Sequence, residues 1–375
     1  MALSKDRFIT LDIFRGMTVC FMIIVNAPGS GATQWAPLDH AAWFGFTPTD
    51  LVFPSFLFAV GNALSFSKNK FESNSAFLRK IGKRTLIIFL LGYLMYWFPF
   101  FHREASGWIF NALGNTRIMG VLQRIALCYF FGSIIVHYCS KKVAVIISAL
   151  LLIGYWAFLL LFGEAGKEFT MLGNAGTRLD ILIMGNAHLY HDKGGPIAFD
   201  PEGLLSTLPA IVNVIAGYLA GAYIQRKGRN YESVTKLLVA GVGLILVALF
   251  WAQFFPVAKK LWTSTFTLLT VGIDLVIIGI LIYAIEIKNI KRGTDFFLVF
   301  GRNSLAIYLL SELLFTVIST IWVKTGLSFY DWINQAFYQP LFPGAFGTLV
   351  FALCYMMLCW FVGYIMDKKK IYIKI

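Results

Sequence analysis

Residues 143–163 read VAVIISALLLIGYWAFLLLFG and contain no charged side chain. A helix needs about 20 predominantly apolar residues to cross the roughly 30 Å of hydrocarbon in a bilayer, so this run is long enough to span one. The whole chain of 375 residues has the same character: 58% of its residues are hydrophobic, 14% are charged, and its mean hydropathy is +0.72. These values lie far from the average of soluble globular domains. The sequence therefore predicts an all-α integral membrane protein.

Nine further runs carry few or no charges. Together with residues 143–163 they predict about ten transmembrane helices. No internal repeat or low-complexity linker divides the sequence, so a single transmembrane domain over residues 1–375 is expected. The nine runs are 16–38, 51–67, 85–101, 118–140, 203–225, 237–258, 261–285, 296–323 and 341–366.

Lysine and arginine are concentrated in every second loop. Cytoplasmic loops near helix ends retain these residues, so the pattern predicts that both termini are cytoplasmic. The formal net charge of +13 is then mostly a topology signal. A basic patch that binds nucleic acid is the rival explanation, but the cations are spread along the chain and we expect no nucleic-acid partner. The cation-rich segments are 5–7, 68–84, 141–142, 226–229, 288–292 and 368–374.

The N-terminal segment has a basic start and an apolar run, but Asp12 and Arg15 interrupt its beginning and no small-residue cleavage pattern follows. We interpret it as a retained first helix rather than a cleaved signal peptide. The five cysteines lie within or at the edges of the apolar runs, and their spacing suits neither disulfides nor a metal. We therefore expect small apolar packing residues and no metal site. The cysteines are Cys20, Cys128, Cys139, Cys354 and Cys359.

The longest non-cytoplasmic loop covers about residues 163–202 and is rich in Gly, Asp and His. It is too long to be a simple connector between neighbouring helices. The loop that bears His40 is predicted to lie on the same face, whereas the cytoplasmic face carries mainly cations. Two faces with different chemistry indicate two different ligands. The polar residues of the external face are Asp39, His40, Asp50, Arg178, Asp180, His188, His191, Asp200 and Glu202.

Residues 38–56, LDHAAWFGFTPTDLVFPSF, run from a polar loop into an apolar segment. A lone histidine among Trp43 and neighbouring phenylalanines is by default a solvated residue of an interfacial aromatic belt. Against this default stand Asn26, at the outer end of the first span, and Asp50, at the start of the second. The imidazole of His40 suits proton removal from an amine or hydroxyl, or transient acceptance of an acyl group. An amide can stabilise an oxyanion, and a carboxylate can fix the tautomer of the ring.

Ionisable groups inside spans are costly and are treated as functional hypotheses. The alternative is an internal ion pair that fixes helix register, which we prefer for Asp274. A cytoplasmic cation cluster that includes Arg84 suits a phosphorylated ligand, although a topology signal explains it equally well. Two classes remain: a membrane transferase with a phosphate-rich cytoplasmic donor, and a transporter with a substrate or proton pathway. The remaining in-span groups are Arg124, Arg302 and Glu312, with Asn303 beside Arg302.

Seven blocks spread over nearly the whole chain strengthen the transferase hypothesis. They are RFITLDIFRGMTVCFMIIVNAPG at 7–29, LDHAAWFGFTPTDLVFPSFLFAVGNALSFS at 38–67, RIMGVLQRIALCYF at 117–130, AHLYHD at 187–192, AFDPEGLLSTLPAI at 198–211, FFPVAKKLWTSTFTL at 254–268 and GRNSLAIYLLSELL at 301–314. In this order they resemble the heparan-alpha-glucosaminide N-acetyltransferase family, the lysosomal transmembrane acetyltransferase and its bacterial homologues.

The resemblance implies transfer of acetyl from cytosolic acetyl-CoA across the bilayer to the amino group of a glucosamine-type sugar. It implies that His40 is the active histidine and Asn26 its neighbouring functional asparagine. Two departures from the lysosomal pattern are expected to matter. Ser311 stands where those members have a histidine before the glutamate, and the luminal extension before the first span is missing. The preferred setting is a bacterial cytoplasmic membrane with a periplasmic acceptor.

The mechanism expected from the resemblance gives each candidate residue a role. His40 either deprotonates the acceptor amine or carries the acetyl group, Asn26 stabilises the oxyanion, and Asp50 orients the imidazole. The alternatives are a small-solute or proton-coupled transporter and an O-acyltransferase acting on an external glycan, and self-association into a homo-oligomer stays open. The donor-binding candidates are Arg84, Arg124, Arg302, Asn303 and Ser311, and the acceptor-binding candidates are Asp180, His188, Asp200 and Glu202.

Overall fold

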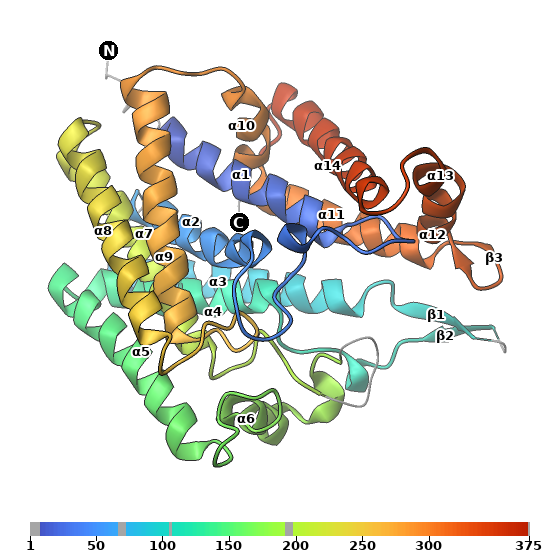
Figure 1. Ribbon diagram of the computed structural model, residues 1–375, viewed down its shortest axis with the longest axis horizontal. Helices are drawn as coiled ribbons and strands as arrows, with labels where there is room; N and C mark the ends of the chain where they lie inside the picture. The colour runs from blue at the N-terminus through green and yellow to red at the C-terminus, as the bar shows by residue number, and fades with distance from the viewer. Residues whose placement is uncertain (1–7, 67–72, 105–106, 192–197, 374–375) are drawn as a thin grey trace. The chain divides into compact units, whose positions relative to one another are not determined.

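The computed structural model describes residues 8–66, 73–104, 107–191 and 198–373 (Figure 1). The cations at positions 5, 7, 68, 70, 193 and 374, which entered the topology prediction, lie outside these residues. The described chain is mostly helical, with two short antiparallel hairpins. All five cysteines are free.

The first half of the chain contains α1 (Ile9–Asn26), η1 (Ala36–Leu38), η2 (Pro48–Leu51), α2 (Val52–Ser65), α3 (Asn74–Trp97), β1 (Phe101–Glu104), β2 (Gly107–Phe110), η4 (Leu113–Asn115), α4 (Val121–Tyr138), α5 (Lys141–Phe162), α6 (Ala175–Met184) and η5 (Asn186–His188). The second half contains α7 (Thr207–Lys227), α8 (Tyr231–Trp251), α9 (Ser264–Leu281), the π-helix η7 (Ile282–Ile287), α10 (Thr294–Arg302), α11 (Ser304–Thr320), β3 (Trp322–Lys324), β4 (Leu327–Ser328), α12 (Phe329–Ile333), the π-helix η8 (Asn334–Tyr338), α13 (Gln339–Leu341) and α14 (Ala345–Lys368).

Seven helices within the described residues are long and apolar enough to cross a membrane. An eighth span results if α10 and α11, which meet at an angle of 82°, are counted as one. The all-α polytopic class is therefore confirmed, whereas the expected count of about ten spans and the cytoplasmic termini stay predictions.

The expected run 143–163 corresponds closely to α5, but other runs correspond less well to the helices. The run 51–67 gives only the short α2, and α3 begins eleven residues before the run 85–101. The run 296–323 is broken at Asn303, and the expected external loop contains the helix α6.

The chain groups into two compact units. The expected single transmembrane domain stays a prediction. The first comprises Met1–His40, Thr47–Phe56 and Leu281–Lys374. The second comprises Ala41–Phe46 and Leu57–Ile280, with Ile375. Each unit is described by itself below.

In the first unit, α1 packs against α10 through two glycines that face each other's helix backbone. A Cβ atom at Gly16 would lie 1.9 Å from the carbonyl oxygen of Phe297, and one at Gly301 would lie 2.0 Å from the carbonyl oxygen of Asp12. Ile13 packs beside this contact with Leu298. The close approach lets Arg15 on α1 donate from Nε to the Gly301 carbonyl oxygen at 2.9 Å, near the C-terminal end of α10.

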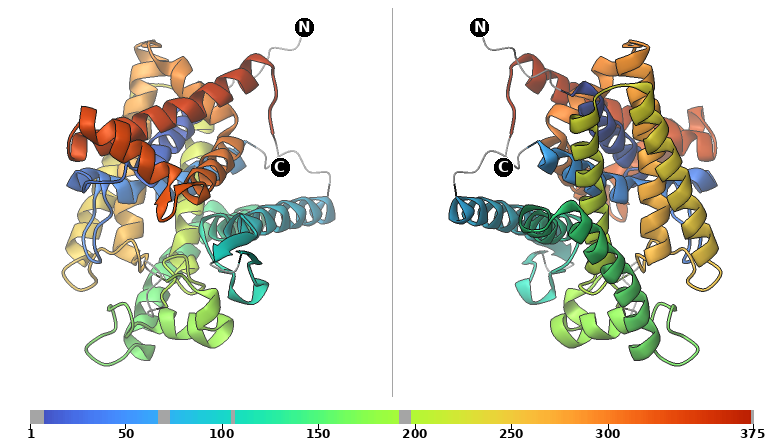
Figure 2. Two further views of the ribbon diagram at one scale, coloured as in Figure 1. Left: turned by 90° about the vertical axis from the view of Figure 1, so that its right-hand side faces the viewer. Right: turned by 90° about the vertical axis from the view of Figure 1, so that its left-hand side faces the viewer.

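In the second unit, glycines again permit close helix contacts. A Cβ atom at Gly61 of α2 would lie 1.9 Å from the Val214 carbonyl oxygen on α7, and one at Gly217 of α7 would lie 2.0 Å from the Phe58 carbonyl oxygen on α2. Helices α8 and α9 run side by side in both figures (Figures 1 and 2). Small residues allow this kind of approach where the lipid supplies no hydrophobic driving force for helix association.

We expect Gly301→Ala to destabilise the protein, because a methyl group has no space against the backbone of α1. Overpacking of this kind typically costs about 1–3 kcal/mol. The measurement is the thermal unfolding midpoint of the purified protein in detergent. Gly154→Ala in α5 is the matched control, since nothing lies within 4 Å of its Cβ position and alanine favours a helix. Equal midpoints for the two variants would contradict the packing argument.

Candidate active site

His40 and Asp50 form a hydrogen-bonded pair at the entrance to α2. The ring Nδ1 of His40 lies 2.7 Å from Oδ1 of Asp50. The Asp50 side chain is fully buried, whereas 39% of the His40 side chain is exposed. A carboxylate on Nδ1 selects the tautomer that carries its proton there. In that tautomer Nε2 carries the lone pair, the atom through which an imidazole accepts a proton or attacks an electrophile.

The local sequence explains why this pair forms. Pro48 begins the short helix η2, and Thr47 before it donates from its backbone N–H to Oδ2 of Asp50 at 3.0 Å. The hydroxyl of Thr47 donates to the carbonyl oxygen of Asp39 at 2.7 Å, which brings the His40 loop back onto the start of η2. The two oxygens of Asp50 therefore serve different partners: one binds the helix entrance and the other binds the imidazole. Asp50 both caps the helix and contacts His40.

Asn26, the last residue of α1, lies beside Glu312 of α11. Its Nδ2 donates to Oε1 of Glu312 at 3.1 Å. Because a carboxylate only accepts, this contact fixes which way the amide points. One N–H of Asn26 is used by Glu312, and the second N–H and the amide oxygen are directed elsewhere.

The other three candidates in the first unit are engaged within the chain. Arg302 pairs through Nη1 with Oδ2 of Asp367 at 2.6 Å. Asn303 donates to the carbonyl oxygen of Ile371 at 2.9 Å, so it binds the segment after α14. The Ser311 hydroxyl donates to the carbonyl oxygen one turn earlier in its own helix. The contacts of Arg302 and Asn303 tie the break between α10 and α11 to the end of α14 and the segment after it.

In the second unit, Arg124 is fully buried on α4. Its Nη2 donates to the carbonyl oxygen of Gly203 at 2.9 Å and to the hydroxyl of Ser206, and its guanidinium stacks 4.9 Å from the centre of the Trp262 ring. Its Nε and Nη1 have no hydrogen-bond partner among the described residues. Arg84 is half-buried on α3.

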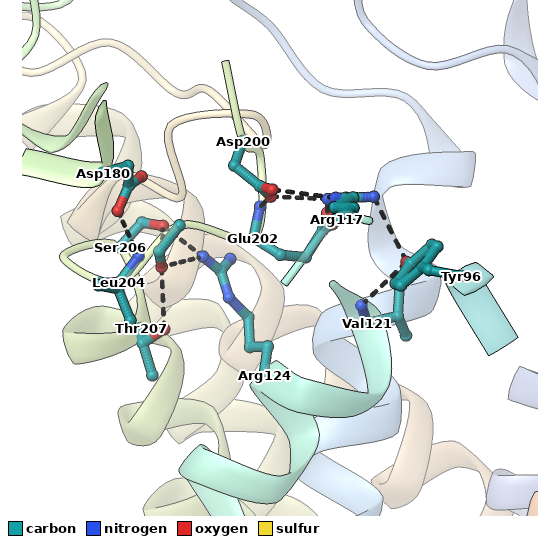
Figure 3. A network of polar contacts seen from close by, with 11 residues as sticks. Tyr96, Arg117, Val121, Arg124, Asp180, Asp200, Glu202, Leu204, Ser206 and Thr207 are labelled. Carbon is teal, nitrogen blue, oxygen red and sulfur yellow. Dashed lines mark hydrogen bonds and ion pairs between the residues drawn. The ribbon is translucent and has the colours of Figure 1, made fainter. Parts of the chain in front are cut away.

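An ion-pair network that the sequence did not single out lies in the second unit (Figure 3). Arg117 binds both oxygens of Asp200, at 2.9 Å from Nε and 2.6 Å from Nη2, and also pairs with Glu202. The rings of Tyr96 and Tyr190 each lie 5.0 Å from its guanidinium carbon. The available sequence signal was the seven-residue spacing of Arg117 and Arg124 in one apolar block.

Charge pairing outweighs burial in this network. Burial alone would lower the pKa of Arg117, but Tyr96 and the two carboxylates hold it well above its ordinary value. Burial alone would raise the pKa of Glu202, but Arg117 and other cations bring it below its ordinary value. Both groups are therefore charged at neutral pH, and the network ties the segment before α4 to the one before α7.

The two remaining acceptor-binding candidates also have partners within the chain. Asp180 of α6 accepts from the backbone N–H of Leu204 at 2.9 Å, and a Cβ atom at Gly203 would lie only 1.9 Å from its other oxygen. Burial raises the pKa of Asp180 to about 7. Nδ1 of His188 lies 2.8 Å from the carbonyl oxygen of Thr116. The structure thus places Asp180, Asp200 and Glu202 around one loop, held by Arg117 and the backbone, while His188 anchors the segment beside Arg117.

A metal ion needs several converging ligands, and no group of three or more His, Cys, Asp or Glu side chains with that arrangement occurs in the described part of the chain.

Comparison with known proteins supports the resemblance. A family model described as the catalytic region of heparan-alpha-glucosaminide N-acetyltransferase matches residues 7–177, which include Asn26, His40 and Asp50. The human heparan-alpha-glucosaminide N-acetyltransferase is 26% identical over 422 residues, covering 98% of this chain and 60% of the relative. The mouse protein of that name is 25% identical over 429 residues, covering 99% and 61%. The chain therefore spans about three fifths of the length of these relatives, and the predicted resemblance is confirmed.

We expect the buried Asp180 to make stability depend on pH. The folded protein binds its proton more tightly than the unfolded chain does, because the ordinary pKa of aspartate is about 4. The stability it contributes is present below that value and is lost as the pH rises through about 7. Asp180→Asn keeps an acceptor for Leu204 and removes the titration. Unfolding midpoints of both proteins between pH 5 and 8 should converge at low pH and diverge in favour of Asp180→Asn at high pH; parallel curves would refute the assignment.

Proposed function

We propose that this chain, which resembles the heparan-alpha-glucosaminide N-acetyltransferases, is a transmembrane N-acetyltransferase. It would move acetyl from cytosolic acetyl-CoA across the bilayer to the amino group of a glucosamine-type sugar on the external side. The observation that carries the proposal is the half-exposed His40 imidazole held at Nδ1 by the buried Asp50, inside the residues that match the catalytic family model. Acyl transfer needs a base held in one tautomer, and 39% of the His40 side chain is exposed.

Two routes fit this arrangement. In the direct route the amine attacks the thioester carbonyl, Nε2 of His40 takes the amine proton, and the carbon–sulfur bond breaks to release CoA. In the covalent route Nε2 attacks the carbonyl first and CoA leaves as the thiolate. The amine then attacks the acetyl-imidazolium, the bond between the acetyl carbon and Nε2 breaks, and the amine proton passes to Nε2 and from there to the CoA thiolate. In both routes Asp50 stabilises the positive imidazolium, and the N–H of Asn26 that Glu312 does not use would stabilise the oxyanion.

The donor side is proposed to be cationic. Arg84 and the exposed cations in the first turns of α3 suit the phosphates of acetyl-CoA, because guanidinium groups bind phosphate through paired hydrogen bonds. The unpartnered Nε and Nη1 of Arg124 suit a polar part of the donor. Arg302, Asn303 and Ser311 are occupied by contacts within the chain, so we propose that Arg302 and Asn303 act through the shape of the α10–α11 break and Ser311 through the packing of α11.

The acceptor side is proposed to include the loop around Asp180, Asp200 and Glu202. Because Arg117 occupies Asp200 and Glu202, we propose that these carboxylates and His188 shape this loop and that the sugar binds beside it. The proposed setting is a bacterial cytoplasmic membrane with about ten spans, both termini in the cytoplasm, a periplasmic acceptor and association of copies into a homo-oligomer.

We expect His40→Ala to abolish acceptor-dependent release of CoA thiol. Loss of a general base lowers a rate by about 10² to 10⁴-fold. The assay measures thiol from acetyl-CoA with purified protein in proteoliposomes, with and without glucosamine, and identifies N-acetyl or O-acetyl product by mass spectrometry. His102→Ala, an exposed histidine on β1, is the matched control and should keep wild-type activity.

Each other outcome of that assay points to a different function. Equal CoA release by wild type and His40→Ala would refute the role of His40. An O-acetyl product would support the O-acyltransferase, and solute uptake into liposomes without acetyl-CoA would support the transporter. No thiol release with a panel of amino sugars would overturn the proposed acceptor class.

We expect Glu312 to act through Asn26 as a positioning residue. Glu312→Ala should lower kcat roughly tenfold, the effect of about 1.4 kcal/mol, and leave KM nearly unchanged, because the Asn26 amide loses its orientation. Glu312→Gln keeps an acceptor oxygen and should lose less. In an Asn26→Ala background, Glu312→Ala should have no further effect on kcat, since residues that act through one contact are not additive. Multiplying losses in the double variant would show that Glu312 acts independently of Asn26.

A further inference from the structure

The β1–β2 hairpin presents an aromatic face that nothing in the described chain covers. Phe101 lies opposite Phe110 in the antiparallel register, and their rings meet edge to face at 5.3 Å. Trp108 is two residues from Phe110 on the same strand, so the three side chains share one face of the hairpin. Their exposed fractions are 47% for Phe101, 68% for Trp108 and 51% for Phe110.

The opposite face of the hairpin carries a polar contact. His102 alternates with Phe101, so it points to the other side, and its Nδ1 lies 2.6 Å from Oδ1 of Asn111. Ile109 lies opposite His102 on this face and is less exposed than Trp108. The hairpin therefore carries three aromatic side chains on one face and the His102–Asn111 contact on the other. A two-stranded hairpin is at best marginally stable in water, so an apolar surface against the aromatic face would stabilise it.

The aromatic face continues an exposed apolar stripe of α3. Leu86, Leu90 and Leu94 are spaced four residues apart, lie on one side of the helix and are all exposed. Trp97 follows three residues later on the same side. Its ring contacts Phe110 at 5.4 Å, and its Nε1 donates to the carbonyl oxygen of Asn111 at 2.9 Å. The stripe thus leads from the helix directly onto the hairpin, which lies beyond the end of α3 (Figure 1).

The length of α3 explains why such a continuation is useful. Its uncharged part covers residues 85–97, about 20 Å at roughly 1.5 Å per residue. The hydrocarbon core of a bilayer is about 30 Å thick, so this part alone is too short to cross it. A short apolar segment is accommodated by its flanking residues, and Trp side chains favour the membrane–water interface.

We infer that the β1–β2 hairpin lies in the bilayer interface at the C-terminal end of α3, with Trp108, Phe101 and Phe110 facing phospholipid. The continuity with the exposed leucine stripe favours lipid over a second copy or a sugar as the covering surface. The inference does not depend on the acetyltransferase activity. The segment after the hairpin carries Arg117, so this anchor holds one end of the Arg117 network in place at the membrane surface.

Site-directed spin labelling of the full chain in phospholipid nanodiscs tests the inference. All five native cysteines are replaced, and one label is attached through either Trp108→Cys or His102→Cys, which lie on opposite faces of the hairpin. We expect the label at 108 to collide severalfold more with lipid-soluble oxygen than with an aqueous nickel chelate, and the label at 102 to show the reverse. Equal aqueous accessibility at the two positions would overturn the inference.

Two further results would also overturn it. Magnetic coupling between labels at 108 on different chains, with protection from both reagents, would assign the face to a second copy. Protection of an aqueous-accessible label by glucosamine would assign it to a sugar. A second measurement compares the wild type with Trp108→Phe, both with their native cysteines. Bromine-labelled phospholipids should quench the tryptophan fluorescence of the wild type more than that of Trp108→Phe. Equal quenching would again oppose lipid contact.

Discussion

The candidate active site depends on the contacts that the carboxylate of Asp50 makes. One of its oxygens accepts from the entrance of η2 and the other accepts from the imidazole of His40. A buried carboxylate without partners would cost several kcal/mol, so these contacts stabilise its position. The geometry of the imidazole is therefore tied to the folding of a helix end. The carboxylate that contacts the loop histidine His40 is the same one that caps η2.

Three of the polar candidate residues in the first unit lie at helix ends. Asn26 ends α1, Asp50 lies at the entrance to α2, and Asn303 lies between α10 and α11. Backbone groups at helix ends lack intrahelical partners and must find side chains, water or ligands. In an apolar chain, the free-energy cost of burying an amide or a carboxylate is therefore lowest at a helix end, where it can bind these backbone groups. Glu312 and Arg15 instead lie within helices: Glu312 accepts from the amide of Asn26, and Arg15 donates to the Gly301 carbonyl oxygen.

The sequence predicted the fold class well and the helix boundaries unevenly, for identifiable reasons. The uncharged run 143–163 matches α5 because charged residues bound it on both sides. The start of α3 was missed because Arg79, Lys80 and Lys83 are good helix formers and extend the helix beyond its apolar part. The 82° bend at Asn303 could not be predicted, because hydropathy reports side-chain polarity and carries no information on the backbone path.

The candidate site shows the same division. His40, Asp50 and Asn26 were found from polar residues beside apolar runs, but the partner of each cation depends on contacts between distant segments. Arg117 lies more than 80 residues from Asp200 and Glu202, and no local pattern joins them. Arg117 pairs with both carboxylates. Any effect of Asp200 and Glu202 on the binding of the proposed acceptor would therefore be indirect, through the conformation of their loop. A buried guanidinium flanked by two tyrosine rings makes that loop costly to rearrange, because removing one partner leaves the others charged and buried. If the proposed acceptor binds beside this loop, it would meet a fixed framework, and selectivity among amino sugars would have to come from residues outside the Arg117 network.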